Sequence, residues 1–230
     1  MSSADAILPV VGSTAGAHGA NFKTGFQMNN RTDEAMSGWL VFHSQGVAAT
    51  AGDAKLHYDL PPHATLAADD VVAEMGASGL GSMDLVVEQG DVPTIVARAY
   101  DDQESGTTGV MVPLFDPARA LAMGDSLSLI VPRDLERFRF NIGVRTLDQG
   151  ATVAVVVRGE DGIVRSELGE MTWPAGYFIQ QPANQFTGVA LLPNESIGFQ
   201  VVQGSAIIYG TTVDNSTNDS SIQILQRRNP

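Results

Sequence analysis

The chain has 230 residues, of which 26 are acidic and 13 basic, so its formal net charge is −13 and its pI is near 4.5. A protein that binds a phosphate backbone needs clustered Lys and Arg, so this composition argues against nucleic acid and against an anionic membrane surface as partners. The chain contains no cysteine, which excludes disulfides, thiol catalysis and thiolate metal sites, so packing must stabilise the fold.

The N-terminal part of the chain combines an apolar segment with a glycine-rich one. Ile7–Val11 is apolar, and residues 12–20, with three glycines among nine residues, are typical of a loop. No basic stretch precedes the apolar segment, so the sequence predicts no signal peptide. No apolar run approaches the roughly 20 residues that a membrane-spanning helix needs, so we expect no membrane insertion.

The first half of the chain carries the patterns of short strands. Phe22–Met28 alternates between a mainly apolar and a polar face, which indicates a strand with one buried side. Trp39–Phe42 predicts a second strand. A third should end at Pro61–Pro62, because proline cannot donate to a central ladder. Asp69 or Asp70 can cap one or two helical turns.

A hairpin and a connector complete this half. Ser82–Asp102 predicts a β-hairpin that turns at Gln89–Asp91. A last strand follows at Thr107–Leu114. Asp116–Asp125 is rich in Ala and Leu, which favours a short stiff connector over a flexible linker.

The second half repeats this plan with a further series of short strands. Turn residues separate them at intervals of about 8 to 15 residues, a spacing typical of an antiparallel β-sandwich and not of parallel crossovers. The strands are predicted at Leu127–Val131, Phe138–Val144, Thr152–Arg158, Ile163–Met171, Gly176–Gln180, Ile197–Val202, Ala206–Val213 and Ser221–Leu225.

The two halves share residues at a constant separation. The differences 196 − 82, 203 − 89 and 204 − 90 all equal 114, and they relate Ser82 to Ser196, Gln89 to Gln203 and Gly90 to Gly204. Upstream, Phe22–Asn30 matches Phe138–Thr146. Downstream, Tyr100–Asp102 matches Val213–Asn215. A period near 110 residues is too long for a solenoid, whose repeats span about 20 to 50 residues.

These patterns predict an all-β fold of two tandem β-sandwich domains, Ig-like or jelly-roll-like, that arose by internal duplication. We assign residues 1–115 to the first copy, 116–125 to the connector and 126–230 to the second copy. Each copy has the size of an ordinary domain and can bury a core of its own.

Two polar loops follow equivalent strands and are the candidate metal sites. Their oxygen-bearing side chains are the ligands that Ca²⁺ prefers, although the same residue types also form turns. The predicted calcium ligands are Asp101, Asp102, Glu104, Asp214, Asn215 and Asp219.

No motif in the sequence indicates catalysis. The glycine-rich segment 76–81 is not a G-x-S-x-G elbow, because Leu80 stands at the last glycine position. His57 and His63 lack the spacing of zinc ligands. Asp69–Asp70 could supply two acids, but a paired-carboxylate site also needs a cleft. We therefore predict no enzymatic activity, no catalytic residue and no cofactor other than calcium.

Four segments carry a resemblance to a known group of proteins. They are LPVVGSTAGAHGANFKTGFQMNN from Leu8, LPPHATLAADDVV from Leu60, GSMDLVV from Gly81 and VARAYDD from Val96. Over nearly its whole length the chain resembles tandem β-sandwich repeats of uncharacterised bacterial secreted and cell-surface proteins. This resemblance implies an extracellular or cell-surface location and a non-enzymatic role in a surface or an assembly.

The leading hypothesis is therefore a structural or adhesive module of a bacterial cell-surface or extracellular assembly. It would contact further copies of itself or other surface proteins through exposed strand edges and the segment Ile7–Val11. The alternative is a carbohydrate- or protein-binding module that uses the loops near Asp101 and Asp214, with a glycan as a possible ligand.

Overall fold

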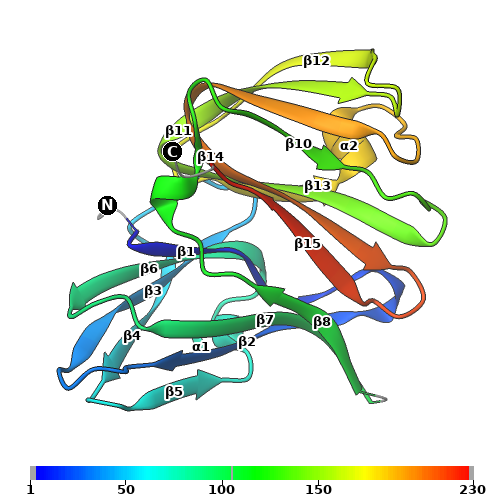
Figure 1. The fold of residues 1–230 in the computed structure, drawn as a ribbon. Coiled ribbons are helices and arrows are strands. Elements are labelled where there is room, and N and C mark those ends of the chain that lie inside the picture. The colour runs from blue at the N-terminus through cyan, green and yellow to red at the C-terminus, as the bar shows by residue number, and fades with distance from the viewer. Residues whose placement is uncertain (1–3, 105, 228–230) are drawn as a thin grey trace. The chain divides into compact units, whose positions relative to one another are not determined.

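A computed structural model gives the fold of the chain and describes residues 4–104 and 106–227. The fold is all-β, as predicted, with one sheet of eight strands and a second of seven (Figure 1). The α-helices are the short segments α1, Val71–Glu74, and α2, Ala183–Thr187. Within the described residues, no helix has the length and apolar character needed to cross a membrane.

The chain divides into two compact units, which are Met1–Ala118 (unit 1) and Arg119–Pro230 (unit 2). The division falls inside the predicted connector, residues 116–125. The connector residues form a single 3-10 turn at Pro117–Arg119 and the short strand β9, Leu121–Ala122.

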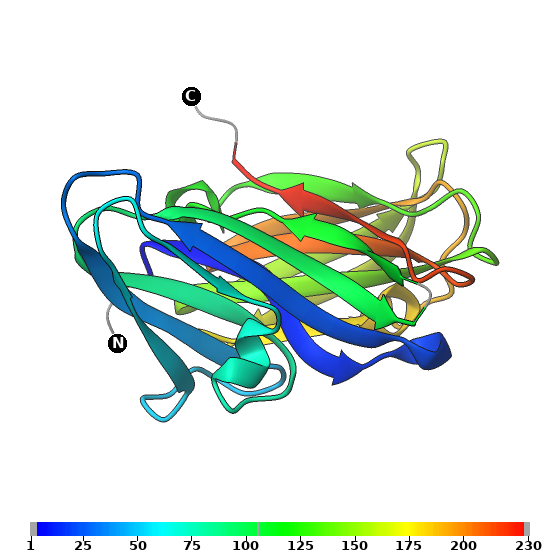
Figure 2. The same ribbon diagram turned by 90° about the horizontal axis from the view of Figure 1, so that it is seen from below.

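In unit 1 the strands pair in the order β4-β3-β6-β1-β2-β7-β8, and β5 pairs with β2. The bounds are β1 Ala6–Ala15, β2 Asn21–Asn29, β3 Met36–Ser44, β4 Ala54–Leu60, β5 Thr65–Ala68, β6 Gly79–Gln89, β7 Thr94–Gln103 and β8 Gly106–Val112. Strand β1 pairs with β6 up to Ser13 and with β2 from Thr14. It thereby joins a β4-β3-β6-β1 layer to a β5-β2-β7-β8 layer, which makes the unit sandwich-like. Figure 2 shows β2 and β7 side by side from below.

Alternating residues of these strands form the core of unit 1. Phe26 of β2, Leu40 and Phe42 of β3, and Met83 and Leu85 of β6 are all buried. Successive residues of a strand point to opposite faces, so every second side chain reaches the interior. The predicted helix start is confirmed, because the Asp70 carboxylate accepts a hydrogen bond from the N–H of Ala73 (3.2 Å) as the N-cap of α1.

In unit 2 the strands pair in the order β10-β14-β11-β12, with β13 on β11, and with β15 and β9 on β14. The bounds are β10 Ser126–Ile130, β11 Phe138–Arg158, β12 Val164–Trp173, β13 Phe178–Pro182, β14 Ser196–Asp214 and β15 Ser220–Leu225. The first half of β11 pairs with β13 and the second half with β12. The two long strands therefore take part in both layers of this unit.

The sequence predicts four strands where the structure has the two long strands β11 and β14. Their ladder is irregular between Thr146 and Ala151, where the two halves of each strand meet. Gly150 and Gly204 both have positive φ there, and a Cβ on Gly204 would lie 2.0 Å from the Gly150 carbonyl oxygen. These glycines let the paired strands bend together, so the turn-like residues mark a bend and not a chain end.

The two units pair their strands in the same order. The layers β1-β6-β3-β4 and β5-β2-β7-β8 of unit 1 correspond to β10-β14-β11-β12 and β13-β11-β14-β15 of unit 2, with α1 and α2 at the same place in the chain order. The register agrees as well. Phe22 lies opposite Asp101 in unit 1, and Phe138 lies opposite Asp214 in unit 2.

Candidate functional site

The loop after β14 is one of the two predicted polar loops, and it forms a tight turn. The N–H of Asp214 donates to the Asp219 carbonyl (2.8 Å), and the N–H of Asn218 donates to the Asp214 carbonyl (2.9 Å). Asn218 has a φ of 57°, a left-handed conformation that Asn tolerates better than most residues. Backbone hydrogen bonds within the loop thus close the turn without a ligand.

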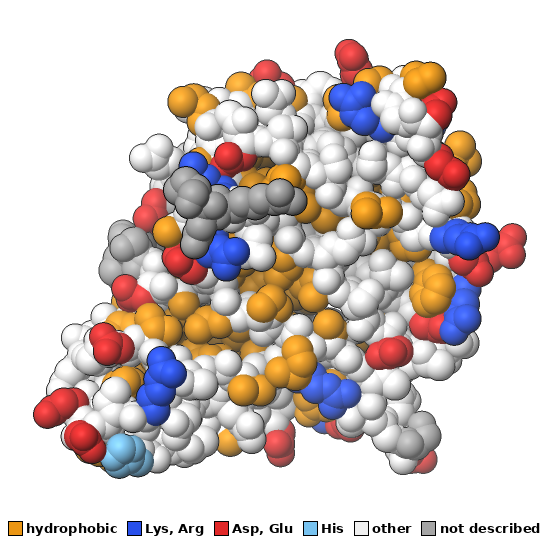
Figure 3. All heavy atoms as spheres, in the orientation of Figure 1, with side chains coloured by type: hydrophobic (Ala, Val, Ile, Leu, Met, Phe, Trp, Pro, Cys, Tyr) orange, Lys and Arg blue, Asp and Glu red, His pale blue; other side chains and the backbone are white. Residues whose placement is uncertain are grey.

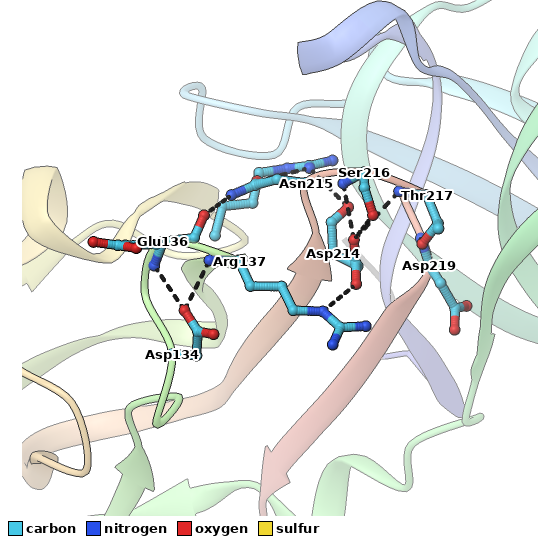
Figure 4. A network of polar contacts seen from close by, with 9 residues as sticks. Asp134, Glu136, Arg137, Asp214, Asn215, Ser216, Thr217 and Asp219 are labelled. Carbon is cyan, nitrogen blue, oxygen red and sulfur yellow. Dashed lines mark hydrogen bonds and ion pairs between the residues drawn. The ribbon is translucent and has the colours of Figure 1, made fainter.

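The carboxylate of Asp214 organises this turn. Its Oδ1 accepts hydrogen bonds from the Ser216 hydroxyl (2.5 Å) and from the N–H groups of Ser216 (2.8 Å) and Thr217 (3.3 Å). Its Oδ2 accepts from Nε of Arg137 (2.9 Å) (Figure 4). The hydrogen bonds from Ser216 and Arg137 hold the pKa of this carboxyl well below its usual range. Asp214 is therefore ionised at neutral pH, and its charge is compensated from within the fold.

The same contacts fasten a second loop, residues 131–137, which precedes β11. The Asp134 carboxylate accepts from the N–H groups of Glu136 (3.1 Å) and Arg137 (2.9 Å). Asn215 then joins the two loops, because its N–H donates to the Arg137 carbonyl (2.9 Å) and its amide to the Glu136 carbonyl (3.0 Å). The two loops form one hydrogen-bonded network.

The equivalent loop of unit 1 is built differently. Asp101 is buried, and its Oδ1 accepts from the Asn21 N–H (2.6 Å) and from the Gln103 amide (2.8 Å). Asp102 instead binds Nζ of Lys23 (2.6 Å), which raises the pKa of that lysine. Glu104 is exposed in the turn before β8. Neighbouring strand residues face opposite sides of a sheet, so Asp101 and Asp102 diverge.

The structure therefore does not gather the six predicted calcium ligands into two sets of carboxylates. Asp214 and Asn215 lie against Arg137, and Asp219 accepts a hydrogen bond from the N–H of Ser220. In the part of the chain that the structure describes, no three His, Asp or Glu side chains are placed to hold a metal ion. Calcium binding by these loops stays a prediction, to be tested with a chelator.

A groove opens beside the Asp214 network, between the loop 131–137 and the loop 188–195. Its volume is about 1040 Å³, and a second cavity of about 340 Å³ shares the residues Leu135, Phe138 and Leu191 with it. The apolar lining residues of the larger cavity are Ile130, Val131, Pro132, Leu135, Phe138, Leu191 and Pro193. The polar ones are Arg133, Asp134, Glu136, Asn194, Thr212 and Gln223.

The far wall of the groove is fixed by a buried carboxylate. Glu195 accepts two hydrogen bonds from the Arg165 guanidinium and one from the Leu192 N–H (2.7 Å). Burial alone would raise the pKa of Glu195, but these bonds hold it below its ordinary value. Arg165 also donates to the Ala190 carbonyl (2.9 Å). Both walls are thus held in place without a ligand.

Sequence reasoning missed this groove. Its walls come from loops that are about 60 residues apart in the chain, and periodicity cannot relate such loops. Single residues were the one indication of the groove in the sequence. Leu135 and Leu191 are apolar residues in stretches that do not read as strands, and apolar side chains outside the core pattern are candidates for a binding surface.

The prediction that Ile7–Val11 is an exposed contact segment is wrong. It belongs to β1, which pairs with β6 on one side, and Ile7 exchanges two backbone hydrogen bonds with Phe115 (2.9 and 2.7 Å) on the other. The side chains of Ile7, Leu8 and Val11 are buried. The segment is therefore an interior strand. An apolar run of this length is typical of a strand buried on both faces, and the sequence alone does not separate that case from an exposed contact segment.

One buried histidine was not singled out from the sequence. Nδ1 of His43 lies 2.5 Å from Asp53 and Nε2 lies 2.9 Å from Asp84, so both ring nitrogens are engaged by carboxylates. The ring is buried, and its two contacts hold β3, β6 and the loop before β4 together.

Comparison with known proteins adds no family to these observations. No protein-family model matches the chain, and no curated protein is similar to it in sequence.

Proposed function

We propose that the chain is a non-enzymatic structural or adhesive module, a subunit or segment of a bacterial cell-surface or extracellular assembly. In this proposal its two units are tandem β-sandwiches, Ig-like or jelly-roll-like, related by duplication. Their common strand order and the matched pairs Phe22–Asp101 and Phe138–Asp214 support that origin. The module associates with other protein chains, including further copies of itself, through the groove of unit 2.

The observation that carries this proposal is the exposed apolar surface around the groove. Ile130 is 62% exposed, Leu192 is 54% exposed and Ile163 is 67% exposed. The segments that carry them are tied together, because Arg165 binds Glu195, Asn194 donates to Glu160 (3.0 Å) and the Val131 N–H donates to the Glu195 carbonyl (2.8 Å). A rigid apolar surface with a polar rim is typical of a protein–protein contact, since little entropy is lost when it binds.

The charge distribution agrees with a contact based on shape and apolar area. Acidic side chains are scattered over the face shown in Figure 3 and are interspersed with Lys and Arg. On this face the charged side chains therefore form no single acidic binding patch.

Three aspartates that could serve as catalytic carboxylates of a hydrolase have structural roles. Asp70 caps α1 and accepts from the Ser13 hydroxyl (2.7 Å), and Asp101 and Asp214 organise their loops. These bonds use the oxygen atoms that general acid–base catalysis would need. They support the non-enzymatic reading.

A carbohydrate-binding module is the second candidate, and one observation near Asp101 favours it. Tyr100 leans over Gly25 of the neighbouring strand, and its hydroxyl donates to the Asp69 carbonyl (3.0 Å). It lines a cavity of about 280 Å³ together with Arg98 and Met111. An aromatic ring that lines a surface cavity suits a sugar ring, so a glycan array probed with the wild type and with Tyr100→Ala would test this candidate.

Light scattering over a range of protein concentrations tests the assembly proposal. We expect the wild type to form larger species as its concentration rises, and the double variant Ile130→Asp, Leu192→Asp to remain monomeric with an unchanged melting temperature. The matched control is Val47→Asp, an exposed apolar position of unit 1. Wild type that stays monomeric at every concentration, or a double variant that assembles equally well, would contradict the proposal.

A further inference from the structure

The strand β10 lies at an edge of its sheet and ends at the groove. It pairs with β14, while the N–H of Ile130 donates to Oε1 of Gln223 (3.0 Å) and its carbonyl accepts from Nε2 of Gln223 (2.9 Å). The Gln223 carboxamide thus occupies the place of a peptide group from a neighbouring strand (β10 and β15 in Figure 1).

The other outward-facing residues of β10 have no such partner. Backbone groups alternate in direction along a strand, so the N–H and C=O of Ser126 and Ser128 point the same way as those of Ile130, away from β14. Ser126 and Ser128 are exposed, and among the described residues no group bonds their outward backbone atoms. These N–H and C=O groups form a short open strand edge to which another strand can be added.

In unit 1 the corresponding edge is covered by the chain itself. Ile7 of β1 lies opposite Asp84, and Ser128 of β10 lies opposite Gly198. Asp84 and Gly198 are 198 − 84 = 114 residues apart, which is the separation of the sequence repeat, so Ile7 and Ser128 are equivalent. The outward N–H and C=O of Ile7 are paired in antiparallel fashion with Phe115, whose side chain is only 5% exposed.

Unit 2 has no described segment that takes the place of Phe115. After β15 the chain leads to the start of the unit, where the Arg227 N–H donates to the Arg119 carbonyl (3.0 Å) and its guanidinium binds Asp125 (3.0 Å). Up to Arg227, the chain after β15 therefore makes no backbone hydrogen bond to Ser126 or Ser128.

The composition of β10 also suits an added strand. Its sequence, SLSLI, is uncharged. The edge strand β12 instead carries Arg165, Glu167 and Glu170 together with two register shifts, which are devices that discourage pairing at an edge.

We propose that the β10 edge at Ser126 and Ser128 binds an extended, uncharged segment of another protein chain in antiparallel pairing. The segment places a bulky apolar side chain where unit 1 places Phe115, and it continues toward the groove at Ile130. The inference rests on the proposed function, of which it names the contact, and it follows the general mode of strand addition.

The test uses the full-length protein and a probe peptide from its own chain. The peptide VMVPLF, residues 110–115, is uncharged when its ends are blocked and carries Phe115 after its natural neighbours. We expect it, with a fluorescent label, to bind the wild type saturably and to protect the amides of Ser126 and Ser128 from hydrogen exchange. A peptide with aspartate in place of the phenylalanine should bind at least about tenfold more weakly, since it loses the apolar contact.

Two variants of the protein localise the binding. Ser128→Pro removes the outward N–H at a site where an edge strand tolerates proline, and Ser128→Lys leaves the backbone intact and adds an edge charge. Each should weaken binding about tenfold or more. The matched control Thr172→Lys, on the edge strand β12, should leave binding unchanged.

No binding to the wild type, binding to both Ser128 variants as tight as to the wild type, or protection on β8 in place of β10 would overturn the inference. If the peptide fails while light scattering still shows assembly that depends on Ile130 and Leu192, the proposed function stands and only this edge is excluded.

Discussion

At the scale of single residues, two of the aspartates that were predicted to bind calcium, Asp101 and Asp214, organise their own loops. Sequence reasoning found Asp101 and Asp214 and matched them to each other, and the structure places both opposite the matched residues Phe22 and Phe138. Their role could not be read from the sequence. The partner of Asp214 is Arg137, which is 77 residues away.

Asp214 should make the stability of unit 2 depend on pH. Its pKa is lowered in the folded chain, so its contribution is complete above about pH 4, near the unfolded value, and is lost as the pH falls through the lower folded value. We expect Asp214→Asn to melt at a lower temperature than the wild type at pH 7, and the difference to shrink below about pH 4. Thermal melts from pH 7 to pH 2 measure this.

The matched control is Asp91→Asn, which changes an exposed aspartate in the turn between β6 and β7. It should melt like the wild type over the same range. A difference between Asp214→Asn and wild type that stays constant down to pH 2 would show that the ion pair and the hydrogen bonds do not depend on this ionisation.

Gly143 is required by the ring of Tyr209. A Cβ at Gly143 would lie 2.0 Å from Cζ of Tyr209, whose hydroxyl donates to Oε1 of Gln180 (2.8 Å) in the interior. We expect Gly143→Ala to reduce the free energy of unfolding by about 1–3 kcal/mol, the usual cost of overpacking. Urea denaturation measures it. Gly52→Ala, where the nearest atom to the new Cβ is 3.7 Å away, should be nearly neutral, and equal effects would refute the packing argument.

At the scale of elements, the hydrophobic periodicity of the sequence predicts individual strands but not the order in which they pair. The alternation of Phe22–Met28 predicted β2, and the segment Ser82–Asp102 contains two strands, β6 and β7, as expected. The predicted hairpin is wrong, because β6 pairs with β1 and β3 whereas β7 pairs with β2 and β8. The short helix α2 and the continuity of β11 and β14 were missed. Gly150 and Gly204 look like turn residues in the sequence, but here they bend paired strands.

Strand β1 should be indispensable to unit 1. Deleting residues 1–11 removes the partner of β6 and of Phe115 together with buried apolar side chains. In a Trp173→Phe background, where Trp39 is the remaining tryptophan, we expect the deletion to abolish the cooperative fluorescence change of unit 1 on adding urea. A retained transition with altered oligomerisation alone would instead favour the surface role first assigned to Ile7–Val11.

At the scale of the whole molecule, each unit has a core of its own. In unit 2 this core includes Val153, Val155, Ile197, Phe199 and Ile208, all of them buried. The Arg227–Arg119 hydrogen bond joins the two ends of the unit. Packed cores of this kind are what independent folding requires.

We therefore expect residues 119–230, expressed alone, to unfold cooperatively. The ring centroids of Trp173 and Phe186 lie 6.0 Å apart, so the fluorescence of Trp173 reports on this core. Urea titration of the fragment and of the full chain with Trp39→Phe should give similar midpoints. A fragment without a cooperative transition would mean that unit 2 needs unit 1 in order to fold.

The sequence by itself determined the all-β class and indicated two halves with residues at a constant separation, because strand alternation and such a separation can be read from the order of the residues alone. Only the tertiary structure decided that Ile7–Val11 is an interior strand, that Asp214 binds Arg137, and that loops at 131–137 and 188–195 enclose a groove. These features depend on contacts between residues far apart in the chain. Such contacts form when the strands pair and pack, and local patterns do not specify them.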